Sequence, residues 1–329
     1  MHLLSKLKKI TYSKVCARVH RLLLKMLGIW VYPSYWRYRI KGRVENPDTS
    51  NFYFAALPNP GAGIGHQMAN WIAGYWWAKQ FHLQFAHLPF STQAWDDFLG
   101  FGVGEPKVSE LKKAGCKVRR IPLFNENTPE SIQLVRDIMS SYSGKKMIFL
   151  CEQDQFYRNQ YGVMSEIQDK FHHAPVRKHE ALKYEASHLN VAIHVRRGDI
   201  MADPTNENLR MRYLSNDYFE KVLHQVVEHF EILQKKPVHI YFFSQGTPED
   251  YPEFHKYENL HWCMDMGAQE SFLHMVYADV LITSKSSFSY KPALLNSKGV
   301  KVCPCNFWHG YPDTEDWIMC DNEGNVEWK

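Results

Sequence analysis

Short apolar runs alternate with amphipathic stretches along the chain, most regularly in its second half. Buried strands are predicted there at 190–195, 238–243, 260–263, 280–283 and 300–303. Apolar residues at helical spacing predict intervening helices near 216–233, 248–257, 268–277 and 290–296. Strands and helices that alternate in this way predict a parallel sheet with helices on both faces.

The first half begins with the same pattern and then becomes less regular. Residues 51–57 read as a strand, and a glycine-containing loop at 61–67 leads into a helix. The other segments are expected to be strands at 83–87 and 145–151, helices and loops at 92–143, and a polar helical bridge at 155–189. The chain is therefore predicted to be α/β, with a domain at 47–187, a Rossmann-like domain at 188–329 and a separate N-terminal segment at 1–46.

The N-terminal segment has a distinct charge. Residues 1–44 contain eleven Lys and Arg and no Asp or Glu, and residues 3–27 carry an apolar stripe. This pattern predicts a basic amphipathic helix that lies on an anionic membrane surface, with packing on the protein's own body as the alternative. This segment lacks the run of about 20 uncharged apolar residues that spans a bilayer, and it lacks the small-residue cleavage site of a secretory signal. We therefore expect a cytoplasmic protein, peripheral at a membrane face.

Charge and cysteine content exclude other classes of protein. After residue 44 the chain contains 28 of its 39 basic residues and all 35 acidic ones, which gives this part a net charge of −7. It is therefore poorly suited to binding nucleic acid. The seven cysteines are scattered and odd in number, which disfavours a disulfide scaffold and suits a reducing compartment. Cys303, Cys305, Cys320 and His309 could bind zinc, but their spacing departs from the usual pairs, and no metal is expected.

One strand of the second half ends in a concentration of charge. The segment 190–193 is apolar, and His194, Arg196, Arg197, Gly198 and Asp199 follow at or just beyond the strand end. Ligands of open α/β sheets bind where strands end, and the planar arginine fork suits a phosphate. The sequence therefore indicates a diphosphate site, although for an isolated pair of arginines surface ion pairs and a core histidine would be the better explanation.

Two further stretches suit an anion. The glycines at 61, 63 and 65 precede a helix, so free N–H groups at its start could face a ligand, although glycine also serves turn geometry alone. Residues 283–289, Thr-Ser-Lys-Ser-Ser-Phe-Ser, follow the strand at 280–283 and open another helix, where hydroxyls and amides could bind an anion or simply cap the helix.

Taken in this order, the stretches 63–67, 193–199 and 286–289 resemble the superfamily that joins the α1,2-, α1,6- and protein-O-fucosyltransferases. Gly-Ile-Gly-His-Gln is similar to the G-x-G-N-Q of the α1,2 branch, and His-Val-Arg-Arg-Gly-Asp to its H-x-R-R-G-D. Residues 278–296 resemble its segment of acidic residue, strand, S-S-F-S and helix. The similarity covers about 52–80 and 188–305, and it departs at His66, where that branch has Asn, and at Tyr290-Lys291-Pro292.

The resemblance implies a GT-B-like fold, two Rossmann-like domains facing across a cleft, and an inverting, metal-independent transfer of fucose from GDP-fucose to a glycan hydroxyl. Arg196 would hold the β-phosphate and Asp199 would orient the arginines. The residues implied to line the donor site are Gly63, Gly65, His66, Gln67, His194, Arg196, Arg197, Asp199, Asp279, Ser286, Ser287, Phe288 and Ser289. No cofactor is implied beyond the GDP-fucose co-substrate.

The general base is less defined by the sequence. A loop that leaves the end of a strand can reach over the cleft, and Asp203 and then Glu207 are the preferred candidates, with Glu152 and Asp154 as alternatives. Two other functions stay open: transfer from another nucleotide sugar, and a catalytically silent protein that binds a glycan or a nucleotide. A donor screen distinguishes the first, and GDP binding without GDP release distinguishes the second.

Overall fold

The computed structural model describes residues 19, 22–23, 26–59, 61–152, 159–201, 205–234 and 236–329, without the side chains of residues 199, 208 and 234. Most of the helix predicted at 3–27 lies outside these residues, as do Asp154 and Asp203. Among the described residues, no helix combines the length and the apolar character that a membrane crossing requires.

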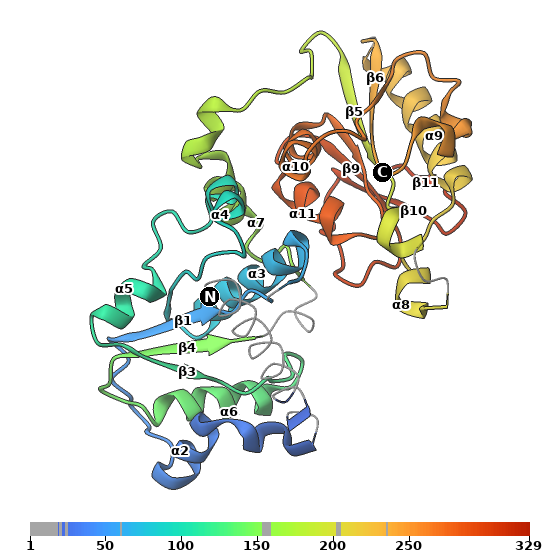
Figure 1. The fold of residues 1–329 in the computed structure, drawn as a ribbon. Coiled ribbons are helices and arrows are strands. Elements are labelled where there is room, and N and C mark those ends of the chain that lie inside the picture. The colour runs from blue at the N-terminus through green and yellow to red at the C-terminus, as the bar shows by residue number, and fades with distance from the viewer. Residues whose placement is uncertain are drawn as a thin grey trace, which may run out of the picture. The chain divides into compact units, whose positions relative to one another are not determined.

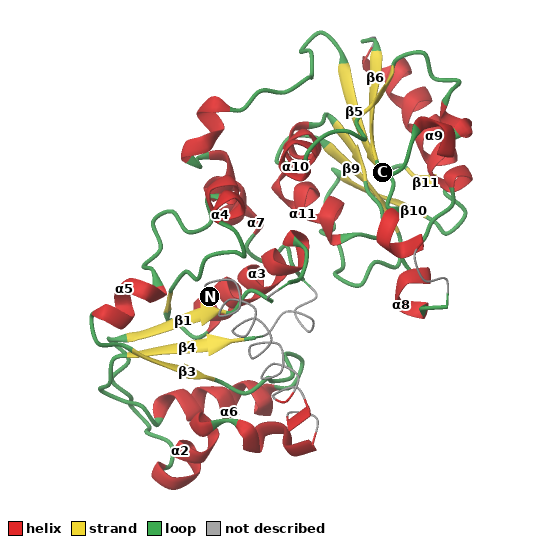
Figure 2. Cartoon of the chain, in the orientation of Figure 1, coloured by secondary structure: helices red, strands yellow, loops and turns green. Residues whose placement is uncertain are grey.

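The chain forms two compact units, each with its own sheet (Figures 1 and 2). The first unit contains the described residues of Met1–Leu57, Ala73–Leu88 and Glu105–Phe156, and the second those of Pro58–Ile72, Pro89–Gly104 and Tyr157–Lys329. The two parallel sheets confirm the α/β class. All strands of the first sheet precede residue 152, and all strands of the second sheet follow residue 188. The domain boundaries at 46 and 187 stay a prediction.

The first unit has a four-stranded, wholly parallel sheet in the order β2-β1-β4-β3. Its strands are β1 (Phe52–Ala56), β2 (Gln84–Phe85), β3 (Lys117–Arg120) and β4 (Met147–Cys151). Its helical elements include η1 (Gly28–Val31), α2 (Pro33–Lys41), α5 (Val108–Lys113), α6 (Pro129–Ser140) and the second half of α3 (Ile64–Gln80). Helix α2 packs on α6 through Tyr32, Tyr35 and Ile138, all buried.

The second unit has a seven-stranded sheet in the order β11-β10-β9-β8-β5-β6-β7, parallel except between β10 and β11. Its strands are β5 (Leu189–His194), β6 (Val238–Phe243), β7 (Leu260–Trp262), β8 (Val280–Ile282), β9 (Val300–Pro304), β10 (Trp317–Cys320) and β11 (Val326–Glu327). If β5 to β10 are renumbered 1 to 6 in chain order, their order across the sheet, from β7 at the edge to β10, is 3-2-1-4-5-6. This is the doubly wound dinucleotide-binding order.

Helices of the second unit come from three segments of the chain. They are the first half of α3, α4 (Gln93–Leu99), α7 (Met164–His172), η2 (Pro175–His179), η3 (Gly198–Met201), α8 (Glu207–Arg210), α9 (Asn216–Gln234), η4 (Pro248–Asp250), η5 (Pro252–Phe254), α10 (Ala268–Tyr277) and α11 (Ser287–Leu295).

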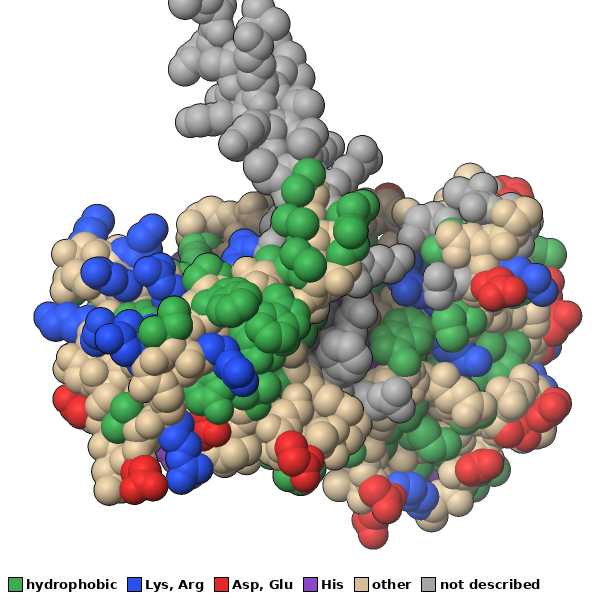
Figure 3. Space-filling view, turned by 90° about the horizontal axis from the view of Figure 1, so that it is seen from below, with side chains coloured by type: hydrophobic (Ala, Val, Ile, Leu, Met, Phe, Trp, Pro, Cys, Tyr) green, Lys and Arg blue, Asp and Glu red, His purple; other side chains and the backbone are tan. Residues whose placement is uncertain are grey.

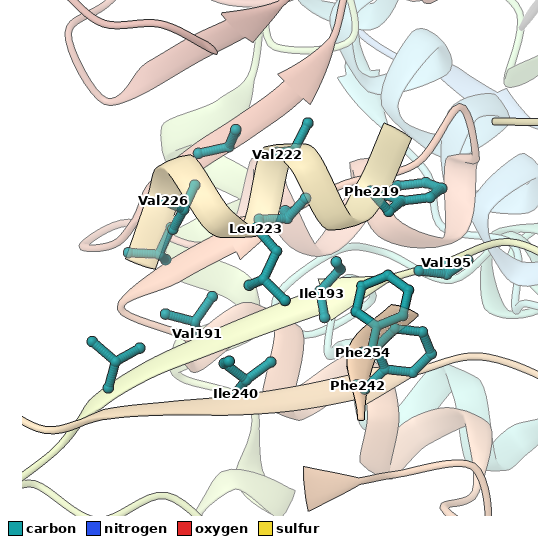
Figure 4. Close-up of a cluster of buried hydrophobic side chains, with 14 of the residues drawn as sticks. Val191, Ile193, Val195, Phe219, Val222, Leu223, Val226, Ile240, Phe242 and Phe254 are labelled. Carbon is teal, nitrogen blue, oxygen red and sulfur yellow. The ribbon is translucent and has the colours of Figure 1, made fainter. Parts of the chain in front are cut away.

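Side-chain alternation along β5 decides which groups face the core and which reach the site. Val191, Ile193 and Val195 point into an apolar cluster built on helix α9 and on strand β6 (Figure 4). The helix contributes Phe219, Val222, Leu223 and Val226 at helical spacing, all nearly inaccessible to solvent. His194, between two core residues, is therefore directed to the opposite face of the sheet.

Most of the predicted elements are confirmed, and the exceptions have local causes. The eight predicted strands all form, within a few residues of the expected bounds. The helix expected at 248–257 is wrong, because Pro248 and Pro252 each open a separate 3-10 turn. The polar segment 155–189 is helical only in part. Strand β3, Lys-Val-Arg-Arg, was missed because it is a largely exposed edge strand with little apolar pattern.

Candidate functional site

The site lies where the chain order of the second sheet reverses. Strands β5 and β8 are neighbours in the sheet, and their crossovers run in opposite directions, to β6 and to β9. Open α/β sheets bind ligands outside the carboxyl ends of the strands at such a point. Residues 195–199 leave β5 there and residues 283–287 leave β8, so the two polar stretches singled out in the sequence meet at the predicted place.

Arg196 joins the two stretches. Its Nη1 donates a hydrogen bond of 2.8 Å to Oγ of Ser286, the buried N-cap residue of α11. The same oxygen accepts from the backbone N–H of Phe288 at 3.2 Å. A guanidinium and the positive end of a nine-residue helix thus occupy the same place, which is a favourable setting for an anion.

His194 lies beside this arginine on the β5 side. It is buried and shares a hydrogen bond of 2.7 Å between its Nδ1 and Oγ of Ser284. Its ring centroid lies 5.6 Å from that of Phe288. Burial, and secondarily the charge of Arg196, lowers the pKa of His194 from 6.5 to about 3. The imidazole is therefore neutral near pH 7, and Arg196 is the cation of this pair.

Glycine is required at position 65 by a close approach. A Cβ on Gly65 would lie 2.7 Å from the backbone C and O of Ser287, closer than any real side chain allows. Both residues belong to the second unit, so the first turn of α3 packs directly against the first turn of α11. Gly63 is not constrained in this way, since a Cβ there would meet nothing within 4 Å.

The two residues after Gly65 differ in their roles. Gln67 is buried, with its Nε2 donating to Ala62 O at 2.8 Å and Ser91 Oγ at 2.9 Å, and its Oε1 accepting from Ser91 N. Its amide therefore holds the glycine loop in place.

His66 Nε2 lies 3.4 Å from Asn59 Nδ2. Burial, with smaller contributions from Lys291 and His66, lowers the pKa of nearby His309 to about 2.

Arg197 points away from Arg196. Its Nη2 donates to Asn216 Oδ1 at 2.6 Å, its Nη1 donates to the carbonyl oxygen of Arg196 at 2.8 Å, and its guanidinium lies over the Tyr213 ring. Asn216 in turn donates to Asp250 O. Arg197 thus anchors the end of β5 to the start of α9 and fixes the backbone of its neighbour. The structure does not bring it to the side of the sheet that carries Ser286.

Two predicted donor residues have roles inside the fold. Ser289 is fully buried, and its Oγ accepts from Ser284 N at 3.1 Å, which shapes the turn between β8 and α11. Asp279 accepts from the backbone and side-chain N–H groups of Asn190 at 2.8 and 3.1 Å. Asn190 is the second residue of β5 and His194 the last, so Asp279 lies about 13 Å from the site, at the amino end of the sheet.

The candidates for a base are only partly covered by the described residues. Glu207 is exposed and opens the short helix α8. Asp203 and the side chain of Asp199 lie outside the described residues. Glu152 belongs to the first unit, where it forms an ion pair with Arg120 at 3.3 Å. Glu207 and Asp203 therefore stay predictions that rest on their place after β5.

The departure from the family pattern at Tyr290-Lys291-Pro292 is a packing feature. Tyr290 is buried and its hydroxyl donates to Gly310 O at 2.9 Å. Lys291 is fully buried, and its Nζ donates to Gln160 Oε1 at 2.8 Å. Sequence reasoning also missed the specific partners Ser284 and Asn216, because nothing in their local pattern marks them as contacts of His194 and Arg197.

The residues that the sequence offers as zinc ligands, Cys303, Cys305, Cys320 and His309, lie in the second unit. Among the described residues, no group of three or more His, Cys, Asp or Glu side chains is placed to hold a metal ion. Burial raises the pKa of the Cys303 thiol to about 12 and also raises the pKa of Cys320, so both behave as apolar core groups.

Comparison with known proteins gives no match in sequence and a weak similarity in structure. No protein-family model and no curated protein matches the sequence. The protein O-fucosyltransferase POFUT1 in complex with GDP aligns at 13% identity and a TM-score of 0.43, over 78% of this chain and 99% of that one. The NodZ alpha-1,6-fucosyltransferase from Bradyrhizobium, co-crystallised with GDP, aligns at 12% identity and a TM-score of 0.41, over 84% of this chain and 97% of that one.

The position of Asp279 yields a first prediction. We expect Asp279→Ala to lower the free energy of unfolding by about 2 kcal/mol, because the buried N–H groups of Asn190 lose their charged acceptor. The affinity for GDP, the ligand that the resemblance implies, should not change. Urea unfolding and calorimetric titration measure the two quantities, and exposed Asp265→Ala is the control, expected within 0.5 kcal/mol of the wild type. Unchanged stability with lost GDP affinity would instead place Asp279 in the donor site.

Proposed function

We propose that the protein is a glycosyltransferase that moves fucose from GDP-fucose to a glycan hydroxyl. The observation that carries the proposal is the meeting of Arg196, Ser286 and the start of α11 at the switch point of a doubly wound sheet. This arrangement suits the diphosphate of a nucleotide sugar. The similarity of the segment 193–199 to the arginine motif of the fucosyltransferase superfamily supports GDP-fucose as the donor, and the α1,2 linkage is the type that its closest motif favours.

The chemistry needs a group that stabilises the leaving GDP. Negative charge develops on the β-phosphate as the bond from the sugar carbon to the phosphate oxygen breaks. The fork of Arg196 and the positive end of α11 are already oriented by the fold, so little reorganisation is needed as this charge appears. We propose that this pair replaces the metal ion that other transferases use.

Neighbouring residues complete the donor site in this proposal. The neutral imidazole of His194 would contact the donor through its hydrogen-bonding groups without adding charge, and Phe288 would cover an apolar part of it. Gly65 would act by letting the first turn of α3 pack against the start of α11, and His66 would extend the donor site on the α3 side. Gln67, Arg197 and Ser289 would act as positioning residues for the loop, the strand end and the helix cap.

Inversion at the sugar carbon requires a base on the side opposite the leaving GDP. We propose Asp203, then Glu207, because both follow β5 on the segment that can reach over the carboxyl edge of the sheet. A carboxylate held among the phosphates would lie on the side of the leaving GDP and could not remove the proton from the acceptor hydroxyl.

We further propose that the enzyme works on the cytoplasmic face of a membrane, in glycan biosynthesis. The eleven basic residues within positions 1–43 support an electrostatic attachment to anionic lipid. The acceptor would then be a lipid-linked or surface glycan presented at that face.

Substitutions of Arg196 test the phosphate clamp. We expect Arg196→Ala to fold normally and to lower kcat/KM by roughly a hundredfold, a loss of about 3 kcal/mol of transition-state stabilisation. Arg196→Lys should fail almost as badly, because a point charge cannot replace the two-pronged fork. GDP release from GDP-fucose with a panel of glycan acceptors measures the rates, and exposed Arg39→Ala is the charge-matched control. Near-normal turnover in either Arg196 variant would refute the assignment.

Chelation tests metal independence. Activity should persist in EDTA, because Arg196 and the start of α11 meet the charge of the diphosphate. The rate of GDP release is compared before and after dialysis against the chelator. Complete loss that magnesium or manganese restores would contradict the proposal.

Amide substitutions identify the base. Replacing the true base, by Asp203→Asn or Glu207→Gln, should lower kcat about a hundredfold or more and leave GDP affinity unchanged. Single-turnover rates and GDP titration separate the two effects. Wild-type kcat in both variants would move the base elsewhere, to Glu152 or Asp154, or show that the transfer proceeds without one.

A further inference from the structure

The first unit carries a basic pocket that the proposed transfer does not use. The pocket has a volume of about 520 Å³ and opens between α2, the β3 edge and the turn before β4. Its lining residues are Pro33, Arg37, Gly115, Lys117, Arg119, Tyr142, Lys145, Lys146 and Met147. Five of these nine are basic and none is acidic, so the pocket fits an anion.

Several of these groups are held in position by the fold. Arg37 Nε donates to Ser141 O at 3.0 Å, and its guanidinium lies 4.6 Å from the centroid of the Tyr142 ring. Arg119 Nη1 donates to the carbonyl oxygen of Val118 at 3.0 Å. Lys117 and Arg119 are two apart on β3 and therefore project on the same face of this edge strand.

The helix that forms one wall also exposes an apolar surface. Trp36 and Ile40, one turn apart on α2, are 46% and 77% exposed, and Trp30 packs on Trp36 with ring centroids 5.0 Å apart. The indole N–H of Trp36 donates to Trp30 O at 2.8 Å, which fixes the pair. Seen from below, apolar side chains of the first unit gather beside a group of Lys and Arg (Figure 3).

Exposed tryptophan and isoleucine beside a cationic pocket is the composition of a surface that enters the interface of a bilayer. We infer that Trp30, Trp36 and Ile40 insert into the interface of an anionic membrane, while Arg37, Lys117, Arg119, Lys145 and Lys146 bind an anionic lipid headgroup. Charge complementarity selects the lipid, and the apolar side chains distinguish a membrane from a soluble anion, which offers nothing to bury them. The inference extends the proposed membrane location to a defined site, and it does not depend on the donor chemistry.

Co-sedimentation of the full chain with vesicles tests this surface. The wild type should bind phosphatidylglycerol–phosphatidylcholine vesicles and ignore phosphatidylcholine alone. Lys117→Glu with Lys145→Glu, both exposed, should lower the partition coefficient at least about tenfold. The matched control reverses exposed Lys178 and Lys298 of the second unit, with the same change in net charge, and should bind nearly as the wild type.

A second pair of variants tests the apolar part. Ile40→Asp should weaken vesicle binding, whereas Ile232→Asp should not, although the two side chains are equally exposed at 77% and 78%. Far-UV circular dichroism and urea unfolding verify that each variant is folded, and calorimetric titration with GDP verifies an unchanged donor site.

Three results would overturn the inference. If the pocket variant and Ile40→Asp both bind vesicles as well as the wild type does, the basic segment 1–43 alone attaches the protein. Failure of the wild type to bind anionic vesicles would refute the membrane location and this site together, without touching the GDP proposal. Displacement by millimolar glycerophosphate or a sulfated glycan, with Ile40→Asp binding normally, would assign the pocket to a soluble anion.

Discussion

The order in which the second sheet is wound is the constraint on which the site depends. Because β5 and β8 are neighbours whose crossovers leave in opposite directions, residues ninety positions apart meet at one edge. The hydrogen bond from Arg196 to Ser286 then places a fixed positive charge at the start of α11. The packing of α9 on the other face holds β5 in register, since Ile193 and Val195 are core residues and His194 between them is not. A slip of one residue would exchange the histidine for an aliphatic side chain at the site.

Much of this arrangement could be predicted from the sequence. Apolar runs bounded by polar residues identify buried strands such as β5 and β6, and the alternation with helices predicts a parallel sheet. The strand end at Arg196 and the serine-rich helix start at Ser286 were recognised separately, and their pairing required only the usual strand order. Edge strands such as β3 escaped because a largely exposed strand keeps little apolar pattern.

The roles of individual side chains were less predictable. Arg197 and Arg196 are adjacent and chemically identical, yet the first reaches Asn216 and the second Ser286. The division continues the alternation of β5, which puts residue 197 on the α9 side with Val195 and residue 196 on the side of His194. Asp279 was assigned to the donor site because residues 278–296 resemble the family's segment, but the three residues of β8 separate it from the serines and place it at the opposite edge. Gln67 has a polar side chain beside a glycine loop, and only the structure reveals that Ala62 and Ser91 occupy its amide. Sequence motifs thus locate a site more readily than they distinguish groups that contact a ligand from groups that hold the site together.

The central claim is that the second unit binds the diphosphate of GDP at the start of α11. A crystal structure of the protein with GDP tests it most directly. The account predicts the β-phosphate within hydrogen-bonding distance of the Arg196 guanidinium and of the first backbone N–H groups of α11, with the nucleotide outside the carboxyl ends of β5 and β8. A nucleotide bound at another edge of the sheet, or phosphates that leave Arg196 without contact, would contradict the account.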